Sequence, residues 1–205
     1  MNEEIIFMGD SAMYSFIFYD DIFTLRRERL FKLCDNLRDL NITFRCNGRS
    51  GINTLEDYIK LKEAGCEEIA FGIESGSQKM LDMINKGSTV EDNFKAITLA
   101  KEAGLITKAY LVVGFPGESQ ETVDETKAFM IRANPDKYTV FQFVPLPGCD
   151  VWKNPEKYGI TKIYSPDDGR KLGLEGMIEE VIKQCSPLPS SPGGGRAANS
   201  KSSRG

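Results

Sequence analysis

Short apolar runs alternate with longer segments of helical periodicity along this chain. The short runs are rich in β-branched and aromatic residues, and each is followed by a segment whose apolar residues recur every three or four positions. This alternation is typical of successive βα units around a parallel sheet. It predicts five strands, at Ser15–Tyr19, Ile42–Cys46, Glu68–Ile73, Thr107–Val113 and Tyr138–Val144.

Helix signals fill the intervals between these strands. Thr54 and Thr89 each stand where a hydroxyl can accept a hydrogen bond from the first turn of a helix, and Gly65 suits a helix end. Pro145 closes the last strand because proline has no backbone N–H to donate. The predicted helices are one with Leu30, Leu33, Cys34 and Leu37 on one face, one from Thr54, a short one with Met80, Leu81 and Ile84 inward, and those at 89–104, 120–133 and 172–183.

The length of the chain sets the architecture that these elements can form. A complete eight-fold (β/α) barrel needs about 250 residues, and this chain has 205. We therefore predict an α/β fold, a partial (β/α) TIM-like barrel with about five to six parallel strands and outer helices, over residues 1–185. Residues 186–205 are rich in Ser, Pro and Gly and lack aromatic residues, so we expect a disordered tail there.

The composition of the chain argues against nucleic acid and membranes as binding partners. The formal net charge is -4 and the isoelectric point is near 5.1, which gives no electrostatic reason to bind nucleic acid or an anionic membrane. No run approaches the roughly 20 apolar residues of a membrane span, and Met1–Glu4 lacks the basic start of a signal peptide. We expect a cytoplasmic protein whose partner is a small molecule.

Histidine and cysteine usage excludes several kinds of site. The chain has no histidine, so histidine-based triads and zinc sites of the HExxH type are excluded. Its cysteines are odd in number and widely spread, with no CxxC pair, so we interpret them as reduced and mostly buried thiols. They are Cys34, Cys46, Cys66, Cys149 and Cys185.

Polar residues and glycines gather where the predicted strands end. In parallel α/β sheets, ligands bind outside the carboxyl ends of the strands. Any one of these residues could instead serve as a turn or a helix cap, but their repetition along one rim favours a ligand site. The segments are Asp20–Asp21, Asn47–Arg49, Glu74–Gly76, Gly114–Glu118 and Pro145–Gly148.

The motifs at this rim carry a family resemblance that covers about residues 15 to 150. Together and in order, they resemble the radical S-adenosylmethionine (SAM) superfamily, particularly its branch associated with cobalamin-binding domains. The resemblance implies SAM bound across the top of a partial barrel and cleaved reductively by a [4Fe-4S] cluster. The motifs are Phe18–Phe23, Gly72–Gly76, Asn85–Gly87, Gly114–Glu118 and Pro145–Gly148.

The resemblance also implies roles for individual residues in binding SAM. Asp20 and Asp21 match the position that accepts hydrogen bonds from the ammonium group of SAM, where a carboxylate suits a cation. Lys86 matches the cation that meets the carboxylate of SAM, and Arg49 is a second candidate; the alternative for Lys86 is a solvated lysine at a helix end. Glu74 and Ser75 match the ribose-binding position, and Gly114, Pro116, Gly117 and Val144 match segments that flank adenine.

One part of the family pattern is not found in this sequence. The family holds its cluster with a CxxxCxxC loop after the first barrel strand, and the cysteines here cannot imitate that spacing. We therefore expect the C-terminal portion of a radical SAM enzyme, a fragment or split product without the first family strand, which contributes the SAM-binding rim and is inactive without the cluster segment. A complementing N-terminal polypeptide would supply that segment, and a full-length relative could also carry cobalamin.

Two other functions stay open at this point. The chain could be a degenerate module that binds SAM or another nucleoside without redox chemistry. Alternatively, Asp20, Asp21 and Glu74 could hold magnesium in a hydrolase-like barrel, since that ion prefers oxygen ligands. The substrate and the reaction type are not specified by any of these motifs.

Overall fold

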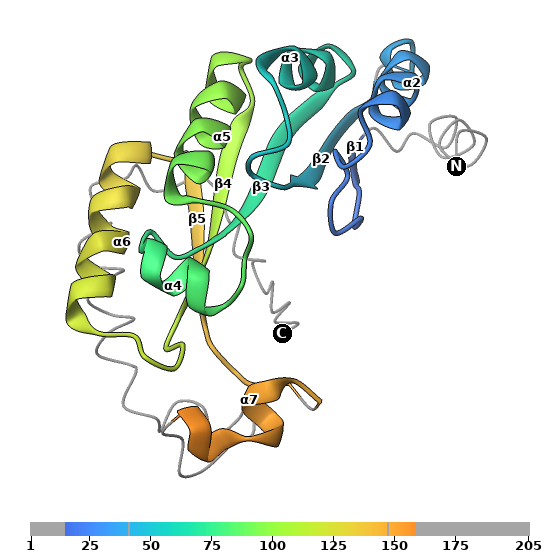
Figure 1. Cartoon of the computed structure of the whole chain (residues 1–205). Coiled ribbons are helices and arrows are strands. Elements are labelled where there is room, and N and C mark those ends of the chain that lie inside the picture. The colour runs from blue at the N-terminus through green and yellow to red at the C-terminus, as the bar shows by residue number, and fades with distance from the viewer. Residues whose placement is uncertain (1–14, 41, 147, 159–205) are drawn as a thin grey trace, which may run out of the picture.

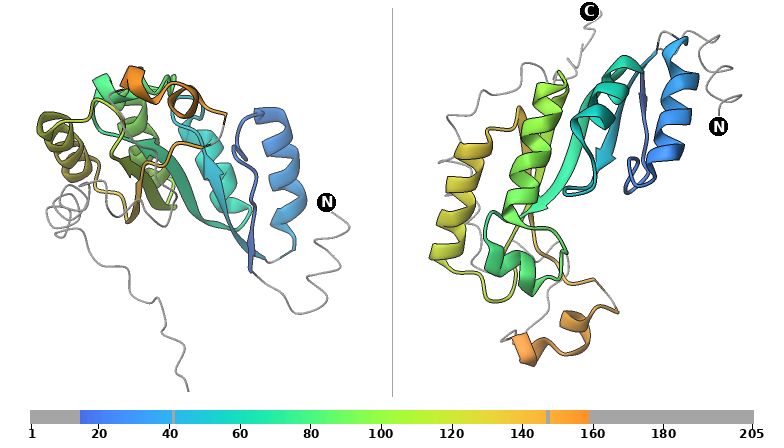
Figure 2. Two further views of the ribbon diagram at one scale, coloured as in Figure 1. Left: turned by 90° about the horizontal axis from the view of Figure 1, so that it is seen from below. Right: turned by 45° about the horizontal axis from the view of Figure 1, so that its top comes forward.

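Five parallel strands form one curved sheet in the computed structural model, which describes residues 15–40, 42–146 and 148–158. The strands lie in chain order, each paired with the next. The curved sheet makes half of a barrel, so the predicted partial TIM-like barrel is confirmed (Figures 1 and 2). The strands are β1 (Ser15–Ile17), β2 (Thr43–Gly48), β3 (Cys66–Glu74), β4 (Ile106–Val113) and β5 (Lys137–Gln142).

The helices follow the strands in the order expected of βα units. Helices α2, α3, α5 and α6 lie along the outer side of the sheet, whereas α4 and α7 lie near the carboxyl ends of its strands (Figure 1). No described helix has the length and apolarity that crossing a membrane requires. The helices are α2 (Arg27–Arg38), α3 (Leu55–Glu63), α4 (Gln78–Met83), α5 (Val90–Glu102), α6 (Gln120–Ala133) and α7 (Asp150–Lys153), followed by the 3-10 helix η1 (Pro155–Tyr158).

The two faces of the sheet differ in polarity because side chains alternate along each strand. In β4, Ala109 and Leu111 are fully buried against the outer helices. Lys108 and Tyr110, which point the other way, are only partly buried. The outer face therefore builds the hydrophobic core, and the concave inner face carries the polar side chains of the strands.

Local signals set the ends of the helices as the sequence predicts. Thr89 accepts a hydrogen bond from the backbone N–H of Asp92 at 3.0 Å, and Asp92 accepts one from the backbone N–H of Thr89 at 2.9 Å, which forms a capping box. At Gly65 φ is 97°, and an added Cβ would lie 2.2 Å from the carbonyl oxygen of Ile42. Only glycine fits there.

Some boundaries differ from the prediction. Strand β1 ends at Ile17 and β5 at Gln142, each two residues before the predicted end. The segment predicted as loop after β5 contains α7, where the sulfur of Cys149 accepts a hydrogen bond from the backbone N–H of Trp152 at 3.4 Å. The predicted helix at 172–183 and the predicted tail at 186–205 lie outside the described residues.

Candidate functional site

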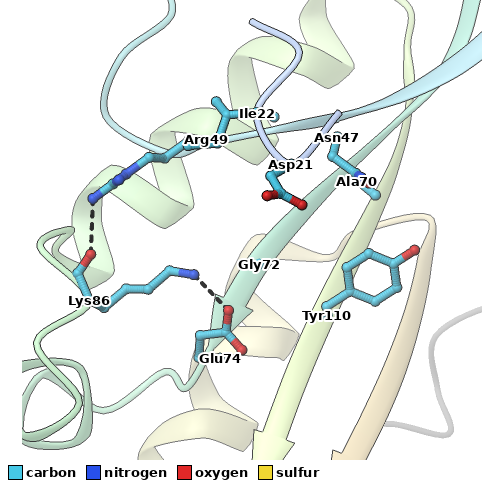
Figure 3. Close-up of a pocket in the computed structure, with 10 residues that line it drawn as sticks. Asp21, Ile22, Asn47, Arg49, Ala70, Gly72, Glu74, Lys86 and Tyr110 are labelled. Carbon is cyan, nitrogen blue, oxygen red and sulfur yellow. Dashed lines mark hydrogen bonds and ion pairs between the residues drawn. The ribbon is translucent and has the colours of Figure 1, made fainter. Parts of the chain in front are cut away.

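A cavity of about 310 Å³ opens at the carboxyl ends of β2 and β3, beside Tyr110 of β4. It lies on the concave side of the sheet, at the edge where the sequence predicts a ligand site (Figure 3). Its walls combine acidic, basic and apolar side chains. The lining residues are Asp21, Ile22, Asn47, Gly48, Arg49, Ala70, Gly72, Glu74, Lys86 and Tyr110.

An ion pair between Glu74 and Lys86 forms one wall of this cavity. The Nζ atom of Lys86 lies 2.6 Å from Oε1 of Glu74, and both side chains keep about a quarter or less of their surface exposed, at 26% and 21%. Glu74 has a φ of 62°, in the left-handed region that non-glycine residues seldom adopt. The pairing of β3 with β4 shifts register between Gly72 and Glu74, which places this left-handed residue at the end of the strand.

Gly72 provides the space in which this pair lies. A Cβ atom at position 72 would lie 2.7 Å from Oε1 of Glu74 and 3.0 Å from Nζ of Lys86. Any larger residue would therefore displace both charged groups. The absence of a side chain at this position lets the carboxylate and the ammonium lie directly over the strand.

Asp21 and Arg49 complete the charged part of the cavity. The Nη2 atom of Arg49 donates to the carbonyl oxygen of Lys86 at 3.1 Å, which fixes the turn that carries this lysine. Within the described ranges, the carboxylate of Asp21 makes no ion pair or hydrogen bond. Figure 3 shows this carboxylate facing the same space as the ammonium of Lys86 and the carboxylate of Glu74.

Asp20 and Ser75, which the sequence also predicts as binding residues, do not line this cavity. The carboxylate of Asp20 lies 3.7 Å from Nη2 of Arg29 in α2. Ser75 is 1% exposed, and its hydroxyl is 3.1 Å from Oγ1 of Thr126 and accepts from the backbone N–H of Ser77 at 3.1 Å. These contacts give Ser75 a structural role in joining the end of β3 to α6.

The residues predicted to flank adenine follow the neighbouring strands β4 and β5 and lie outside the lining of this cavity. The backbone N–H of Gly114 donates to the carboxylate of Glu118, whose pKa is raised by burial and partly lowered by this hydrogen bond. The centroids of the Phe115 and Phe143 rings lie 4.9 Å apart, with the rings tilted by 42°, and the pair adds apolar surface to this part of the rim. The predicted residues concerned are Gly114, Pro116, Gly117 and Val144.

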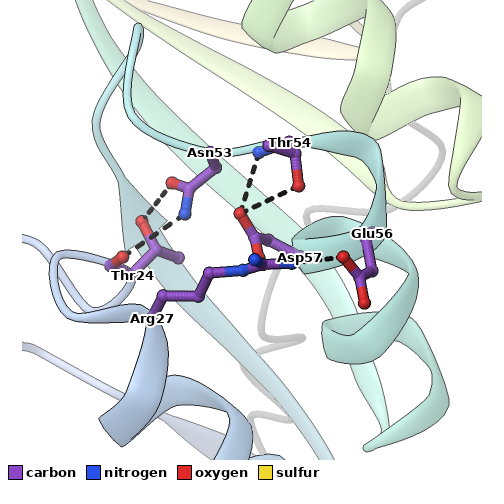
Figure 4. A network of polar contacts seen from close by, with 6 residues as sticks. All are labelled: Thr24, Arg27, Asn53, Thr54, Glu56 and Asp57. Carbon is purple, nitrogen blue, oxygen red and sulfur yellow. Dashed lines mark hydrogen bonds and ion pairs between the residues drawn. The ribbon is translucent and has the colours of Figure 1, made fainter.

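A polar network supports the loop that carries Asp21 (Figure 4). Thr24 follows this loop, and its hydroxyl donates to Oδ1 of Asn53 at 2.6 Å. Nε of Arg27 donates to Oδ1 of the buried Asp57 at 2.7 Å. Burial opposes ionisation of Asp57, but hydrogen bonds from Thr54 and Arg27 outweigh it and hold the pKa of Asp57 below its usual value.

The strands also contribute lining residues that do not belong to the polar segments at the strand ends. Ala70 and Tyr110 lie within β3 and β4, and their side chains point to the concave face. Ile22 follows Asp21 in the loop after β1. Strict alternation in β4 is the signal for Tyr110, because its neighbours Ala109 and Leu111 are apolar and buried.

The described residues do not fit a metal ion or an iron-sulfur cluster. They contain no group of three His, Cys, Asp or Glu side chains that could hold a metal, so the magnesium alternative for Asp20, Asp21 and Glu74 is wrong. Cys46 and Cys66 are buried beneath the outer helices with their sulfurs 3.9 Å apart. A [4Fe-4S] cluster needs three closely spaced thiolates, which this part of the chain does not offer.

Comparison with known proteins identifies the family. A model of the radical SAM superfamily matches residues 2–130. The chain belongs to the radical SAM superfamily. The anaerobic magnesium-protoporphyrin IX monomethyl ester cyclase of Rubrivivax gelatinosus is 33% identical over 166 residues, which are 74% of this chain and 30% of the relative. An uncharacterized methyltransferase of Pyrococcus horikoshii is 31% identical over 138 residues, covering 66% of this chain and 30% of the relative.

Solved radical SAM structures share the fold. The methyltransferase TsrM of Kitasatospora setae, solved with cobalamin and a [4Fe-4S] cluster bound, superposes with a TM-score of 0.68 at 17% identity, over 80% of this chain and 34% of that one. Coproporphyrinogen III oxidase of Escherichia coli gives a TM-score of 0.66 at 18% identity, over 89% and 44%. The chain spans about a third of the length of the two curated relatives named above.

The charged groups of the cavity suit SAM. SAM has an ammonium and a carboxylate in its methionine part and two hydroxyls on its ribose. The cavity offers two carboxylates, at Asp21 and Glu74, and two cations, at Arg49 and Lys86. The ammonium and the carboxylate of SAM can therefore each meet a side chain of opposite charge.

Proposed function

We propose that this chain binds SAM in the cavity at the carboxyl ends of its strands and serves as the SAM-binding part of a radical SAM enzyme. The observation that carries the proposal is the Glu74–Lys86 pair, which lies over Gly72 and faces Asp21 in one cavity. Asp21 would accept from the ammonium of SAM, and Lys86 with Arg49 would bind its carboxylate. The second oxygen of Glu74 would accept from the ribose hydroxyls.

Reductive cleavage of SAM requires an iron-sulfur cluster in this superfamily. The cysteine loop that holds the cluster is not in this sequence, and no step of that chemistry can be assigned to the residues described above. We therefore propose that the chain does not cleave SAM alone and that a complementing polypeptide carries the cluster. We also place the protein in the cytoplasm, where buried thiols such as Cys34, Cys46 and Cys66 stay reduced.

A second candidate function is a module that binds SAM or another nucleoside without redox chemistry. The observation that favours it is that the described residues provide a cavity for SAM but no ligands for the cluster that would cleave it. The charged cavity is present, whereas the described residues offer no set of thiolates for a cluster. Both functions predict that the chain binds SAM, and they differ in whether SAM is cleaved once a cluster-bearing partner is added.

Calorimetric titration of the full chain with SAM tests the shared prediction. We expect saturable binding, weakened about tenfold or more in Glu74→Gln and in Lys86→Met, because each variant removes one charged partner of the ligand. Lys95→Met, at an exposed position on the outer helix α5, is the matched control and should bind SAM as the unmodified chain does. A well-folded sample that shows no heat of binding with SAM would refute both functions.

Formation of 5'-deoxyadenosine separates the two functions. A polypeptide containing the cluster loop is reconstituted anaerobically with iron and sulfide, mixed with this chain and SAM, and reduced with dithionite. A SAM-binding part of a radical enzyme should yield 5'-deoxyadenosine only in the mixture. A yield equal to that of the cluster-bearing polypeptide alone would leave the binding module as the function.

A further inference from the structure

A second cavity lies on the concave face of the sheet, below the proposed SAM cavity. Its volume is about 210 Å³, and it is deeper along the strands, further from their carboxyl ends. The two cavities share Asn47, Ala70 and Tyr110, which Figure 3 shows on the side of the upper cavity away from Lys86. A ligand in the lower cavity would therefore lie next to a ligand in the upper one.

Two basic side chains line this lower cavity without an acidic partner among the described residues. Arg45 of β2 is exposed, and its side chain makes no ion pair or hydrogen bond within that part of the chain. The ammonium of Lys108 in β4 lies over the ring of Tyr110, 5.0 Å from its centroid. Strands β2 and β4 flank β3, so the two cations face the same space from either side.

The acidic group of the lower cavity is already neutralised. Oε2 of Glu68 lies 2.6 Å from Nζ of Lys137, and the side chain of Glu68 is only 10% exposed. This pair joins β3 to β5 across β4. The cavity therefore keeps an excess of positive charge from Arg45 and Lys108, although the chain as a whole is acidic.

Apolar and aromatic side chains of β1 and its following loop form the wall next to Arg45, because Ile17 pairs with Arg45 in the sheet. Ile17 is 41% exposed, and Tyr19 is 83% exposed. Phe18 packs against Phe23 and Phe44, which holds this wall in place. The cavity thus pairs a cationic floor with an apolar side, and this combination suits an anionic group attached to an apolar body.

We propose that the lower cavity binds the substrate of this protein and that this substrate is an organic anion held by Arg45 and Lys108. The assignment of the bound molecule as substrate rests on the proposed SAM site, because the two cavities adjoin. The binding of the anion itself does not depend on SAM. Arg45 offers a fork of N–H donors to a carboxylate or a phosphate, and Lys108 adds a point charge.

Small aromatic probes test this proposal on the full chain. Benzoate, phenyl phosphate and benzylamine are each titrated at millimolar concentration and followed by saturation-transfer NMR. We expect saturable binding of the two anions and none of benzylamine. The comparison of benzoate with phenyl phosphate shows whether the cavity prefers a carboxylate or a phosphate. In Arg45→Gln/Lys108→Gln, the affinity for the better anion should fall about tenfold or more.

A control variant shows whether anion binding depends on the cations of the lower cavity or only on the overall charge of the protein. Lys32→Gln/Lys62→Gln removes two exposed lysines from the outer helices α2 and α3 and should leave anion binding unchanged. Equal binding of benzylamine, no saturable binding of either anion, or unchanged anion binding in Arg45→Gln/Lys108→Gln would overturn the proposal. If SAM binds and the anions do not, only this proposal fails; if the anions bind and SAM does not, the proposed function fails.

Discussion

Replacing Gly72 by Ala is the sharpest test of how the proposed SAM cavity is built. The backbone of Gly72 is not among the glycines with positive φ, so alanine is compatible with its conformation. The added Cβ would lie 2.7 Å from Oε1 of Glu74, about 0.7 Å short of the 3.4 Å at which ordinary contacts begin. It would also lie 3.0 Å from Nζ of Lys86, so both charged groups must move.

The expected effect on stability is small, whereas the effect on binding is large. The atoms nearest the new Cβ are the ends of the flexible side chains of Glu74 and Lys86, which can move away from it. Loss of their partly exposed ion pair costs about 0–1 kcal/mol. Replacing glycine by alanine restores about 0.4–1 kcal/mol by restricting the unfolded chain. Displacing a charged hydrogen-bond partner of SAM costs about 1.5–3 kcal/mol, which is about a tenfold to hundredfold loss of affinity.

Gly76→Ala is the matched variant with the opposite outcome. Its Cβ would lie 2.5 Å from Cβ of Phe129 and 2.7 Å from Cα of Thr126, and neither atom can swing away because both belong to the frame of α6. Overpacking of this kind costs about 1–3 kcal/mol. Urea denaturation measures the free energy of unfolding of both variants, and calorimetric titration measures their affinity for SAM.

Two results would show that Gly72 does not have this role. If Gly72→Ala binds SAM as tightly as the unmodified chain, the Glu74–Lys86 pair is not part of the binding site. If Gly72→Ala unfolds as easily as Gly76→Ala, the space over Gly72 is needed for packing and not for a ligand. Only a stable variant with weakened SAM binding agrees with the proposed SAM site.

Other predictions concern the support of the site and the buried thiols. Asp57→Asn should lower the free energy of unfolding by about 1–3 kcal/mol in urea, because it breaks the pair with Arg27 and weakens the cap of α3. The pKa of Asp57 is lower in the folded than in the unfolded chain, so its ionised carboxylate stabilises the fold above the unfolded value of about 3.9, and this stabilisation is lost as pH falls through the folded pKa. In Asp57→Asn, the free energy of unfolding should therefore fall less steeply as the pH is lowered. The same fall as in the unmodified chain would contradict the pairing of Asp57 with Thr54 and Arg27. Iodoacetamide at pH 8 should modify the exposed Cys149 and spare Cys34, because burial raises the pKa of the Cys34 thiol to about 12. Equal labelling of the two cysteines in mass spectrometry would contradict the burial of Cys34.

Much of the fold follows from rules that act over a few residues. The capping residues Thr54 and Thr89 open α3 and α5 as predicted, because a hydroxyl three residues before a carboxylate forms a capping box wherever the chain turns into a helix. The predicted inward residues of α2 are all buried, since helical periodicity alone selects that face. The order of the strands follows from the right-handed βα connection.

Which residues line the cavity depends on contacts between distant parts of the chain, and rules that act over a few residues do not predict these contacts. Asp20 and Asp21 are neighbours of the same type, yet Asp21 lines the cavity and Asp20 lies near Arg29, a residue placed by the packing of α2. Ser75 has the polarity of a ligand-binding residue but is used by Thr126 of α6, which lies 51 positions further along the chain. Sequence patterns identify the rim, whereas tertiary packing decides which residues on it face the cavity.

Buried and half-buried residues alternate along β4, and the half-buried ones bear on the function of the concave face. If the concave face served only to complete a core, Lys108 would be apolar, because a half-buried cation that has no carboxylate partner among the described residues gains nothing from packing. The presence of Lys108 between the buried residues Thr107 and Ala109 supports the polar ligand proposed for that face. Lys108 lines only the lower cavity and Lys86 only the upper one, so variants at the two positions test the two proposed ligands separately. Loss of anion binding in Arg45→Gln/Lys108→Gln together with intact SAM binding would therefore show two adjoining sites on one sheet.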